Sequence, residues 1–279
     1  MKKDFKVAID TANGATYNVA EKIFKKLGIN YEIIHNSPNG ININENCGST
    51  HLDDLKRYVI ENGMDLGLAY DGDGDRCLAV DDTGNIIDGD KIMAIFANYL
   101  FEKGKLKNDT LVATVMSNLG LSKFSEEKGI NFVQTKVGDR YVLEEMLKNG
   151  YNLGGEQSGH IIMLDYNPTG DGILTSIMLI SILLEKNVSS SDLARIVTIY
   201  PQVLVNAKVT NDKKEIYKED KEISEEISRL EKEMNGRGRV LIRASGTEPL
   251  IRVMIEGEDI QYITEKAKYI AGLIEEKGN

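Results

Sequence analysis

The chain repeats one short plan of alternating strands and helices, and this repetition limits the folds that it can adopt. Gly28-Ile-Asn-Tyr31 is echoed by Gly129-Ile-Asn-Phe132, and Gly63-Met-Asp-Leu-Gly67 is echoed by Gly150-Tyr-Asn-Leu-Gly154. Each echo lies at a turn that leads into a predicted strand. Strands that alternate with helices at this rhythm are typical of βαβ units. We therefore expect an α/β protein with two similar three-layer domains built on mostly parallel sheets.

The two expected copies occupy residues 1–104 and 105–198. In the first copy, apolar residues recur every four positions from Ala15 to Leu27, which predicts a helix that Gly28 ends. Short apolar runs before and after it predict strands. A third region, 199–279, lacks this strict alternation, so we expect it to form a small α+β domain. Its predicted elements are, in order, strand Leu204–Val209, helix Ile216–Met234, strands Arg239–Ala244 and Leu250–Ile255, and helix Ile260–Ile274.

Composition excludes several classes of protein. The 279 residues include 34 basic and 44 acidic side chains, a net charge of −10, which disfavours nucleic acid and anionic membranes as partners. No apolar run approaches the ~20 residues needed to cross a bilayer. Two cysteines, Cys47 and Cys77, and three histidines indicate neither a disulfide framework nor a zinc site. We expect a cytoplasmic protein, either a monomer or a homodimer.

The most distinctive loop is Asp71-Gly-Asp-Gly-Asp-Arg76, which follows a predicted strand over Met64–Tyr70. Ligands of open α/β sheets bind beyond the carboxyl ends of strands. Two carboxylates about 4 Å apart repel by ~4 kcal/mol at an effective dielectric near 20, so three that converge need a cation between them. Oxygen ligands favour Mg²⁺ over zinc. We predict that Asp71, Asp73 and Asp75 bind Mg²⁺; the alternative is a solvated acidic turn.

Two other motifs with related patterns do not fit this loop. An EF-hand needs glycine and glutamate at its sixth and twelfth positions, where this chain has Arg76 and Asp82. A dinucleotide-binding fingerprint needs a different glycine spacing and a helix that opens directly after it.

A second polar loop, Gly155-Glu-Gln-Ser-Gly-His160, follows the corresponding strand of the second copy. Glu156, Ser158 and His160 are spaced two apart, so an extended backbone would turn all three to one side. Such a set suits the hydroxyls of a sugar, and His160 could transfer a proton. The alternative is a turn at a strand edge with incidental polar residues.

The third loop, Arg243-Ala-Ser-Gly-Thr-Glu-Pro249, has Arg252 beyond it. Two guanidinium groups, hydroxyls and glycine N–H groups suit one phosphate. The bland alternative is an ordinary turn at Ser-Gly-Thr. Lys136-Val-Gly-Asp-Arg140 could add positive charge, although Asp139 and Arg140 could equally begin a helix.

Together the three loops resemble the metal, sugar and phosphate loops of the α-D-phosphohexomutases, in the family's order, from about residue 4 to the C-terminus. Asn44-Glu-Asn-Cys-Gly-Ser-Thr-His51 and Val137-Gly-Asp-Arg-Tyr-Val142 look most like the bacterial phosphoglucosamine mutase branch. The resemblance implies an isomerase that interconverts glucosamine 6-phosphate and glucosamine 1-phosphate with Mg²⁺.

The resemblance also implies roles for individual residues. Asp71, Asp73 and Asp75 would bind Mg²⁺, Arg76 would stabilise charge beside it, and His160 would act as an acid or base. The residues implied to bind the phosphosugar are Glu156, Ser158, His160, Arg243, Ser245, Gly246, Thr247 and Arg252.

The family has four domains, and its first carries a phosphoserine in a Thr-Ala-Ser-His-Asn-like loop that this chain does not contain. We therefore expect that the chain opens at what resembles domain 2, needs the missing domain as a partner and has no turnover alone. A phosphomannomutase or phosphoglucomutase of the same family and a non-catalytic phosphosugar-binding protein stay open as alternatives. A Mg²⁺-dependent phosphatase is weaker, because no nucleophilic aspartate has the expected partners.

Overall fold

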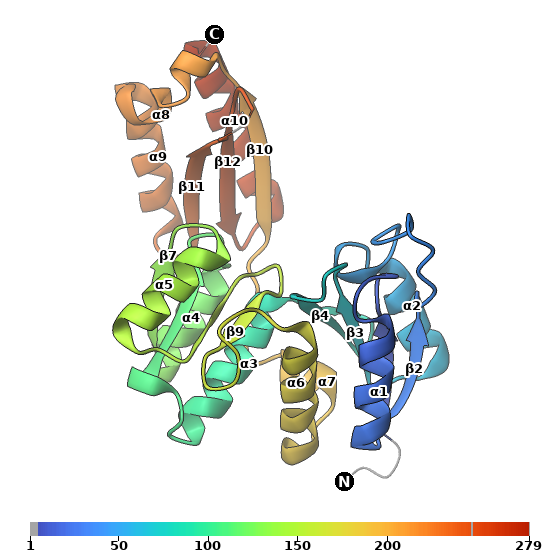
Figure 1. Cartoon of the computed structure of the whole chain (residues 1–279). Coiled ribbons are helices and arrows are strands. Elements are labelled where there is room, and N and C mark those ends of the chain that lie inside the picture. Colours follow the sequence, from blue (N-terminus) through green and yellow to red (C-terminus); the bar gives the residue numbers. More distant parts are fainter. Residues whose placement is uncertain (1–4, 247, 279) are drawn as a thin grey trace. The chain divides into compact units, whose positions relative to one another are not determined.

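The structure, a computed structural model, describes residues 5–246 and 248–278 (Figure 1). The chain forms two compact units, which are described separately below. The first consists of Met1–Ser117 and Leu121–Thr198, and the second of Asn118–Gly120 and Ile199–Asn279.

The first sheet of the first unit has five strands: β1 (Lys6–Asp10), β2 (Asn30–Ile34), β3 (Leu66–Tyr70), β4 (Cys77–Asp81) and β5 (Ile86–Ile87). Their order is β2-β1-β3-β4-β5. Strand β1 pairs in parallel with β2 and β3, whereas β4 runs antiparallel to β3. Every residue of β3 is buried, as expected for a central strand covered on both faces.

The second sheet repeats this connectivity. Its strands are β6 (Thr110–Thr114), β7 (Asn131–Thr135), β8 (Leu153–Gly155) and β9 (Ile161–Met163), in the order β7-β6-β8-β9. Strand β6 pairs in parallel with β7 and β8, and β9 returns antiparallel to β8. The predicted pair of similar α/β sheets is therefore confirmed.

The second sheet is mostly parallel as predicted, whereas the first has as many antiparallel pairs as parallel ones, and each sheet contains an antiparallel return. Only six residues separate β3 from β4, and five separate β8 from β9. A parallel return needs a crossover of a dozen or more residues, so connections this short force the next strand to run antiparallel. The polar loops predicted to carry the chemistry are these two reversals.

The α-helices described between residues 5 and 198 are α1 (Tyr17–Leu27), α2 (Asp53–Asn62), α3 (Gly89–Glu102), α4 (Leu119–Lys128), α5 (Asp139–Asn149), α6 (Gly172–Lys186) and α7 (Ser190–Ala194). Helix α1 ends as predicted, because Gly28 adopts the left-handed conformation with φ 67°. Helix α3, which lies within the predicted domain 1–104, contacts β6 and β8 of the second sheet. Helix α6 lies later in the chain yet contacts β3 and β4 of the first sheet.

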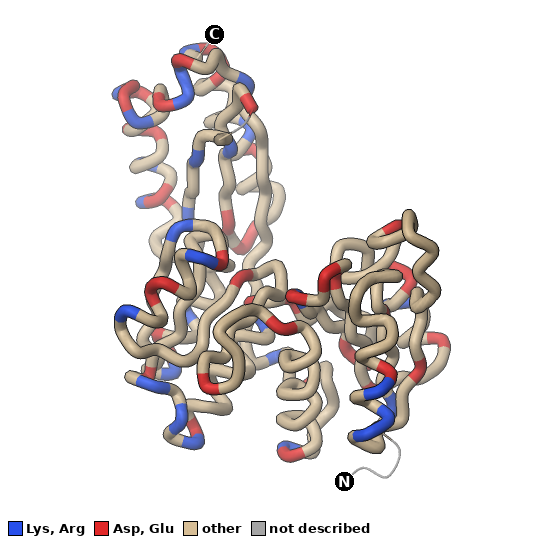
Figure 2. Tube along the Cα trace, viewed as in Figure 1, with Lys and Arg blue, Asp and Glu red and all other residues tan. Residues whose placement is uncertain are grey.

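Helix α6 is almost free of charge, and Figure 2 shows it as an uncharged coil with charges only at its end. Its sequence has no ionisable residue before Glu185. An apolar helix of this kind is expected to be covered on several sides, and α6 contacts α3 as well as β3 and β4. None of the described helices combines the length and the hydropathy that a membrane span requires.

The second unit is a small α+β structure. Strands β10 (Gln202–Lys208), β11 (Gly238–Ala244) and β12 (Leu250–Gly257) form an antiparallel sheet in the order β10-β12-β11, and they pack with helices α8 (Ile216–Glu219), α9 (Lys221–Met234) and α10 (Ile260–Gly278). The helix predicted over Ile216–Met234 is interrupted at Asp220, whose carboxylate accepts the Ile223 N–H and caps α9.

Candidate functional site

The acidic loop brings its three aspartates together. Asp71 follows β3 and is buried, and one ligand atom from each of Asp71, Asp73 and Asp75 lies within 4.8 Å of the others. The Asp71 Oδ1 atom accepts the N–H groups of Gly74 and Arg76, each at 3.1 Å. Gly74 has φ 80°, which favours glycine. The loop therefore folds around Asp71 and turns the three carboxylates toward one point.

The electrostatics of this loop fit a cation. The pKa of Asp71 is raised to about 6, chiefly by burial and also by the neighbouring carboxylates of Asp75 and Asp73. Arg76 Nε lies 3.7 Å from both Asp71 Oδ2 and Asp75 Oδ1, too far for a hydrogen bond. Among the described residues, the buried Asp75 Oδ1 has no hydrogen-bond partner. Hard oxygen ligands with one unpaired buried atom suit a divalent cation such as Mg²⁺.

The loop over 156–160 is a tight turn, so the prediction that an extended backbone turns its three polar side chains to one side is wrong. The Gly159 N–H donates to the Glu156 carbonyl at 3.0 Å, and the Glu156 N–H donates to the His160 carbonyl at 3.0 Å. Gly159 has φ 92°. In a turn of this kind the side chains of Glu156, Ser158 and His160 point in different directions. Glu156 Oε1 accepts the Gly138 N–H at 3.1 Å, and the buried Ser158 Oγ has no partner within the described part of the chain.

Backbone hydrogen bonds attach each polar loop to the elements that surround the other. The Cys77 N–H donates to the Gly159 carbonyl at 3.1 Å, and the Gly172 N–H donates to the Gly74 carbonyl at 2.9 Å. A Cβ atom on Gly89 would lie 2.1 Å from the Glu156 carbonyl oxygen. Because no side chain fits there, the start of α3 approaches the 156–160 loop more closely than another residue would permit. The two loops are thus held beside each other through the residues that flank them within the first unit.

His160 connects the two loops through its side chain. Its ring is buried, and Nδ1 lies 3.1 Å from Asp75 Oδ2. The Gly170 N–H donates to Nε2, also at 3.1 Å. Both ring nitrogens therefore have partners, which the spacing of the sequence motif did not indicate.

The loop after β1 also lies at this site, although no sequence motif predicted it there. The Ala15 N–H donates to the Gly72 carbonyl at 2.8 Å, so this loop lies against the acidic loop. The Thr16 hydroxyl is buried and has no partner among the described residues. Thr16, Asp73 and Asp75 line the same cavity of about 570 Å³. The signal was available in Asp10-Thr-Ala-Asn-Gly14, a polar segment directly after a strand.

Asp10, His35 and Cys47 form a second group with ligand atoms close together, but their contacts indicate a structural role. The Asp10 carboxylate accepts the Ala12 and Gly48 N–H groups at 2.8 and 2.9 Å, and His35 Nδ1 lies 3.0 Å from it. Burial raises the pKa of Cys47 to about 11, so its thiol stays protonated at neutral pH. Asp10 therefore fixes the loops around β1 instead of leaving its oxygens to a metal.

In the second unit, Arg243 pairs with Arg252 directly across β11 and β12. Like charges directly opposite each other destabilise a sheet, so this pair suits an anion. Ser245 is buried, and its Oγ accepts the Glu248 N–H at 3.2 Å. Gly246 is exposed. Thr247 lies outside the described residues.

Lys136 and Arg140 have partners on α5. Lys136 Nζ lies 5.9 Å from the centre of the Tyr141 ring, and Arg140 Nε donates to Glu144 at 2.7 Å. Asp139 begins α5. These contacts agree with the alternative that this segment starts a helix.

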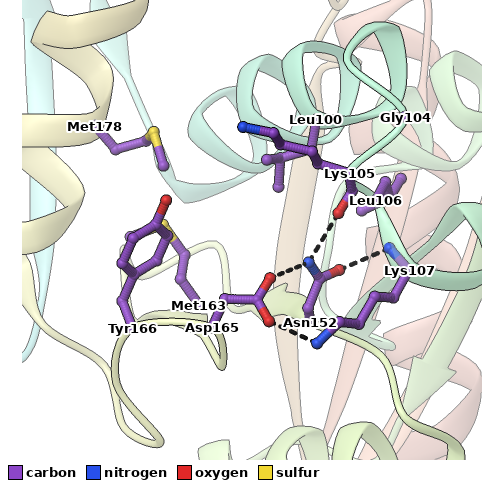
Figure 3. A pocket seen from close by; sticks show the side chains of 10 residues that line it. All are labelled: Leu100, Gly104, Lys105, Leu106, Lys107, Asn152, Met163, Asp165, Tyr166 and Met178. Carbon is purple, nitrogen blue, oxygen red and sulfur yellow. Dashed lines mark hydrogen bonds and ion pairs between the residues drawn. The ribbon is translucent and has the colours of Figure 1, made fainter.

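Another cavity, of about 320 Å³, lies near the amino ends of β6 and β8 (Figure 3). Three of its polar side chains bind one another: Asn152 Nδ2 donates to Asp165 at 2.6 Å and to the Lys105 carbonyl at 2.9 Å. Lys107 Nζ donates to the same carboxylate at 2.6 Å. The cavity lies at the opposite strand ends from the polar loops.

Three family models match the chain. Phosphoglucomutase/phosphomannomutase alpha/beta/alpha domain II matches residues 1–84, alpha/beta/alpha domain III matches 88–200, and the C-terminal domain matches 204–273. Among curated relatives, the phosphoglucosamine mutases of Clostridium acetobutylicum and Clostridium novyi are 59% and 57% identical over 277 residues, covering 99% of this chain and 62% of each relative. The chain thus spans about three fifths of the length of these relatives.

Solved structures share the fold. A phosphoglucomutase/phosphomannomutase family protein from Burkholderia thailandensis has a TM-score of 0.83 at 21% identity, covering 100% of this chain and 62% of its own. Aspergillus fumigatus N-acetylphosphoglucosamine mutase, in complex with GlcNAc-6P and magnesium, has a TM-score of 0.76 at 19% identity, covering 96% of this chain and 65% of its own. With three domain models of one family in sequence and relatives more than half identical along it, the chain belongs to the phosphoglucomutase/phosphomannomutase family, the α-D-phosphohexomutases.

Proposed function

We propose that the full-length protein interconverts glucosamine 6-phosphate and glucosamine 1-phosphate, and that this chain contributes its cation, sugar and phosphate loops. The names of the curated relatives support this substrate. The observation that carries the proposal is the convergence of Asp71, Asp73 and Asp75 within 4.8 Å beside the interlocked 156–160 loop. Such a site suits the transfer of a phosphoryl group on a sugar.

Mg²⁺ is the proposed cation at the acidic loop. When bound, a divalent cation neutralises charge that develops on a transferring phosphoryl group. Asp71, Asp73 and Asp75 would hold it, and the Arg76 guanidinium would add positive charge at the edge of the site. The magnesium named in the Aspergillus fumigatus complex supports the choice of ion. A cation of this charge also offsets the repulsion between the three carboxylates.

Glu156 and Ser158 are the proposed sugar ligands. The Gly138 N–H holds one Glu156 oxygen at 3.1 Å, which fixes the carboxylate before the sugar arrives. The Ser158 hydroxyl is buried without a partner among the described residues, so it is ready to exchange hydrogen bonds with a sugar hydroxyl. The predicted proton transfer by His160 stays a prediction, and the partners of its ring favour another role.

The proposed phosphate clamp consists of Arg243, Ser245, Gly246, Thr247 and Arg252. Opposed guanidinium groups bind one phosphate through several charge-assisted hydrogen bonds. In the proposed reaction this clamp holds the phosphate that is not being transferred, and it serves either end of the sugar.

The reaction requires a phosphorylated serine, which we assign to the part of the relatives that this chain does not cover. The test mixes the chain with the remaining N-terminal part of the Clostridium acetobutylicum relative, phosphorylated on its active serine. We expect conversion of glucosamine 6-phosphate in the mixture and in neither component alone. Asp73→Asn should abolish that conversion, and Glu61→Gln, on an exposed part of α2, should not.

Two outcomes would contradict this proposal. Faster conversion of mannose or glucose phosphates than of glucosamine phosphates would favour a phosphomannomutase or phosphoglucomutase. If the mixture binds glucosamine 6-phosphate in calorimetry but converts none of these sugars, the protein is a phosphosugar-binding protein without catalytic function.

A further inference from the structure

We infer that His160 is a positioning residue, which holds Asp75 in the orientation that binds the cation by donating a hydrogen bond from Nδ1. The inference rests on the proposed cation site at Asp71, Asp73 and Asp75. It gives His160 a task that needs no change in its protonation, in contrast to the proton transfer expected from the sequence motif.

The tautomer follows from the partners of the ring. The Gly170 backbone N–H points to Nε2 at 3.1 Å, so Nε2 must accept and cannot carry the proton in the neutral ring. The proton is then on Nδ1, which lies 3.1 Å from Asp75 Oδ2 and donates to it. Asp139 Oδ2 is 3.9 Å from Nε2, beyond hydrogen-bond distance, so the Gly170 contact determines the assignment.

The ring is also fixed in place. Only 4% of His160 is exposed. Gly170 packs directly against the ring, because a Cβ atom there would lie 2.5 Å from Cε1 and 2.6 Å from each ring nitrogen. The next residue, Asp171, accepts the Leu174 N–H at 2.9 Å and caps α6, which anchors this segment. A donor held this rigidly can set the orientation of its acceptor.

Asp75 divides its two oxygens between two tasks. Oδ2 accepts from His160, whereas the buried Oδ1 has no hydrogen-bond partner in the described residues. Hydrogen bonds from a second layer of residues orient the carboxylates that bind metals, and their loss typically weakens metal affinity 10–100-fold. His160 therefore fixes one oxygen of Asp75 and leaves the other for the cation.

Two substitutions separate positioning from general structural support. His160→Ala removes the donor, while His160→Asn keeps an N–H donor near the place of Nδ1. Mn²⁺ binding, followed by the loss of the free-ion electron paramagnetic resonance signal, should weaken about 10–100-fold in His160→Ala. Most of that loss should be recovered in His160→Asn. His51→Ala removes an exposed histidine elsewhere and should bind Mn²⁺ as the wild type does.

The outcomes distinguish this inference from the proposed function. If the wild type binds Mn²⁺ and His160→Ala binds it equally well, the positioning role is wrong and the cation site stands. If the wild type binds no Mn²⁺, both the positioning role of His160 and the proposed cation site are wrong. A measurement independent of folding in the variants is the ¹⁵N NMR spectrum of the wild-type histidines. We expect the Nδ1–H tautomer for His160, and an Nε2–H tautomer would overturn the inference.

Discussion

Arg243 and Arg252 face each other directly across antiparallel strands β11 and β12, so two positive charges oppose one another in the second unit. An anion between them would relieve this repulsion. We therefore expect glucosamine 6-phosphate to raise the melting temperature of the chain. At 100 times its dissociation constant, a ligand stabilises the folded state by about 2.7 kcal/mol.

Arg252→Gln should remove most of that increase. Its stability without ligand should change little, because the lost contact with Glu248 is a partly exposed pair at 3.2 Å and such pairs contribute at most about 1 kcal/mol. Arg229→Gln, which loses an exposed pair on α9, is the matched control and should keep the full ligand effect. A ligand effect that survives in Arg252→Gln would remove this arginine from the phosphate site.

The acidic loop predicts a pH dependence of stability. The pKa of Asp71 is raised from 3.8 to about 6 in the folded state, chiefly by burial. The folded state therefore binds the Asp71 proton more tightly than the unfolded state does. This tighter binding stabilises the folded state below about pH 4, and the stabilisation is lost as the pH rises through about 6. Without divalent cations, Asp71→Asn should be more stable than the wild type at pH 7, by on the order of 2 kcal/mol, and equally stable at pH 4.

Differential scanning calorimetry in a chelating buffer between pH 4 and pH 7.5 measures this difference. Taking the difference between two proteins cancels the other titrating groups. Glu61→Gln, an exposed carboxylate on α2, should follow the wild-type curve. A constant difference between Asp71→Asn and the wild type over this range would show that Asp71 does not titrate as described.

Gly89 sets the distance between the start of α3 and the 156–160 loop. Because a Cβ atom there would meet the Glu156 carbonyl oxygen at 2.1 Å, Gly89→Ala should lower the free energy of unfolding by about 1–3 kcal/mol. Gly272→Ala is a control that should raise the free energy of unfolding, since a Cβ on this residue of α10 meets nothing within 4 Å. Alanine favours a helix over glycine by up to about 1 kcal/mol. Urea denaturation of both variants gives the comparison, and equal stabilities would contradict it.

A substitution of Ser158 should affect sugar binding without lowering the stability of the fold. Its buried hydroxyl has no partner among the described residues, so Ser158→Ala should leave the free energy of unfolding unchanged or slightly higher. The same change should weaken glucosamine 6-phosphate binding in calorimetry. Ser125→Ala is the counterpart: its hydroxyl donates to the Leu121 carbonyl at 2.9 Å, so its loss should cost about 1 kcal/mol without affecting the ligand. Equal sugar affinities in the two variants would exclude Ser158 from the sugar site.

Much of the fold could be predicted from local patterns. The apolar run over Met64–Tyr70 predicted β3, and the polar residues after it predicted the acidic loop. Both could be predicted because a buried strand is apolar and the loop beyond it is polar. The pairing of α6 with β3 and β4 could not be predicted. The apolar sequence of a helix predicts that the helix is buried, but it does not predict which sheet the helix packs against.

The sequence predicted which residues belong to the candidate site, but it did not predict which of them contact one another. The sequence identified Glu156, Ser158 and His160 as a group, yet a tight turn separates their side chains and aims His160 at Asp75. That turn depends on close backbone approaches at Gly159 and Gly170, which arise from tertiary packing. The loop after β1 was missed for the same reason, since its place beside Gly72 depends on the order of strands in the sheet.

Isothermal titration of the chain with Mg²⁺ tests directly whether the aspartate loop binds a divalent cation. We predict one ion per chain, with an affinity that falls at least tenfold in Asp73→Asn and is unchanged in Glu61→Gln. Binding should weaken as the pH falls below about 6, where Asp71 takes up its proton. The absence of Mg²⁺ binding, or an equal affinity in Asp73→Asn, would contradict the proposed site.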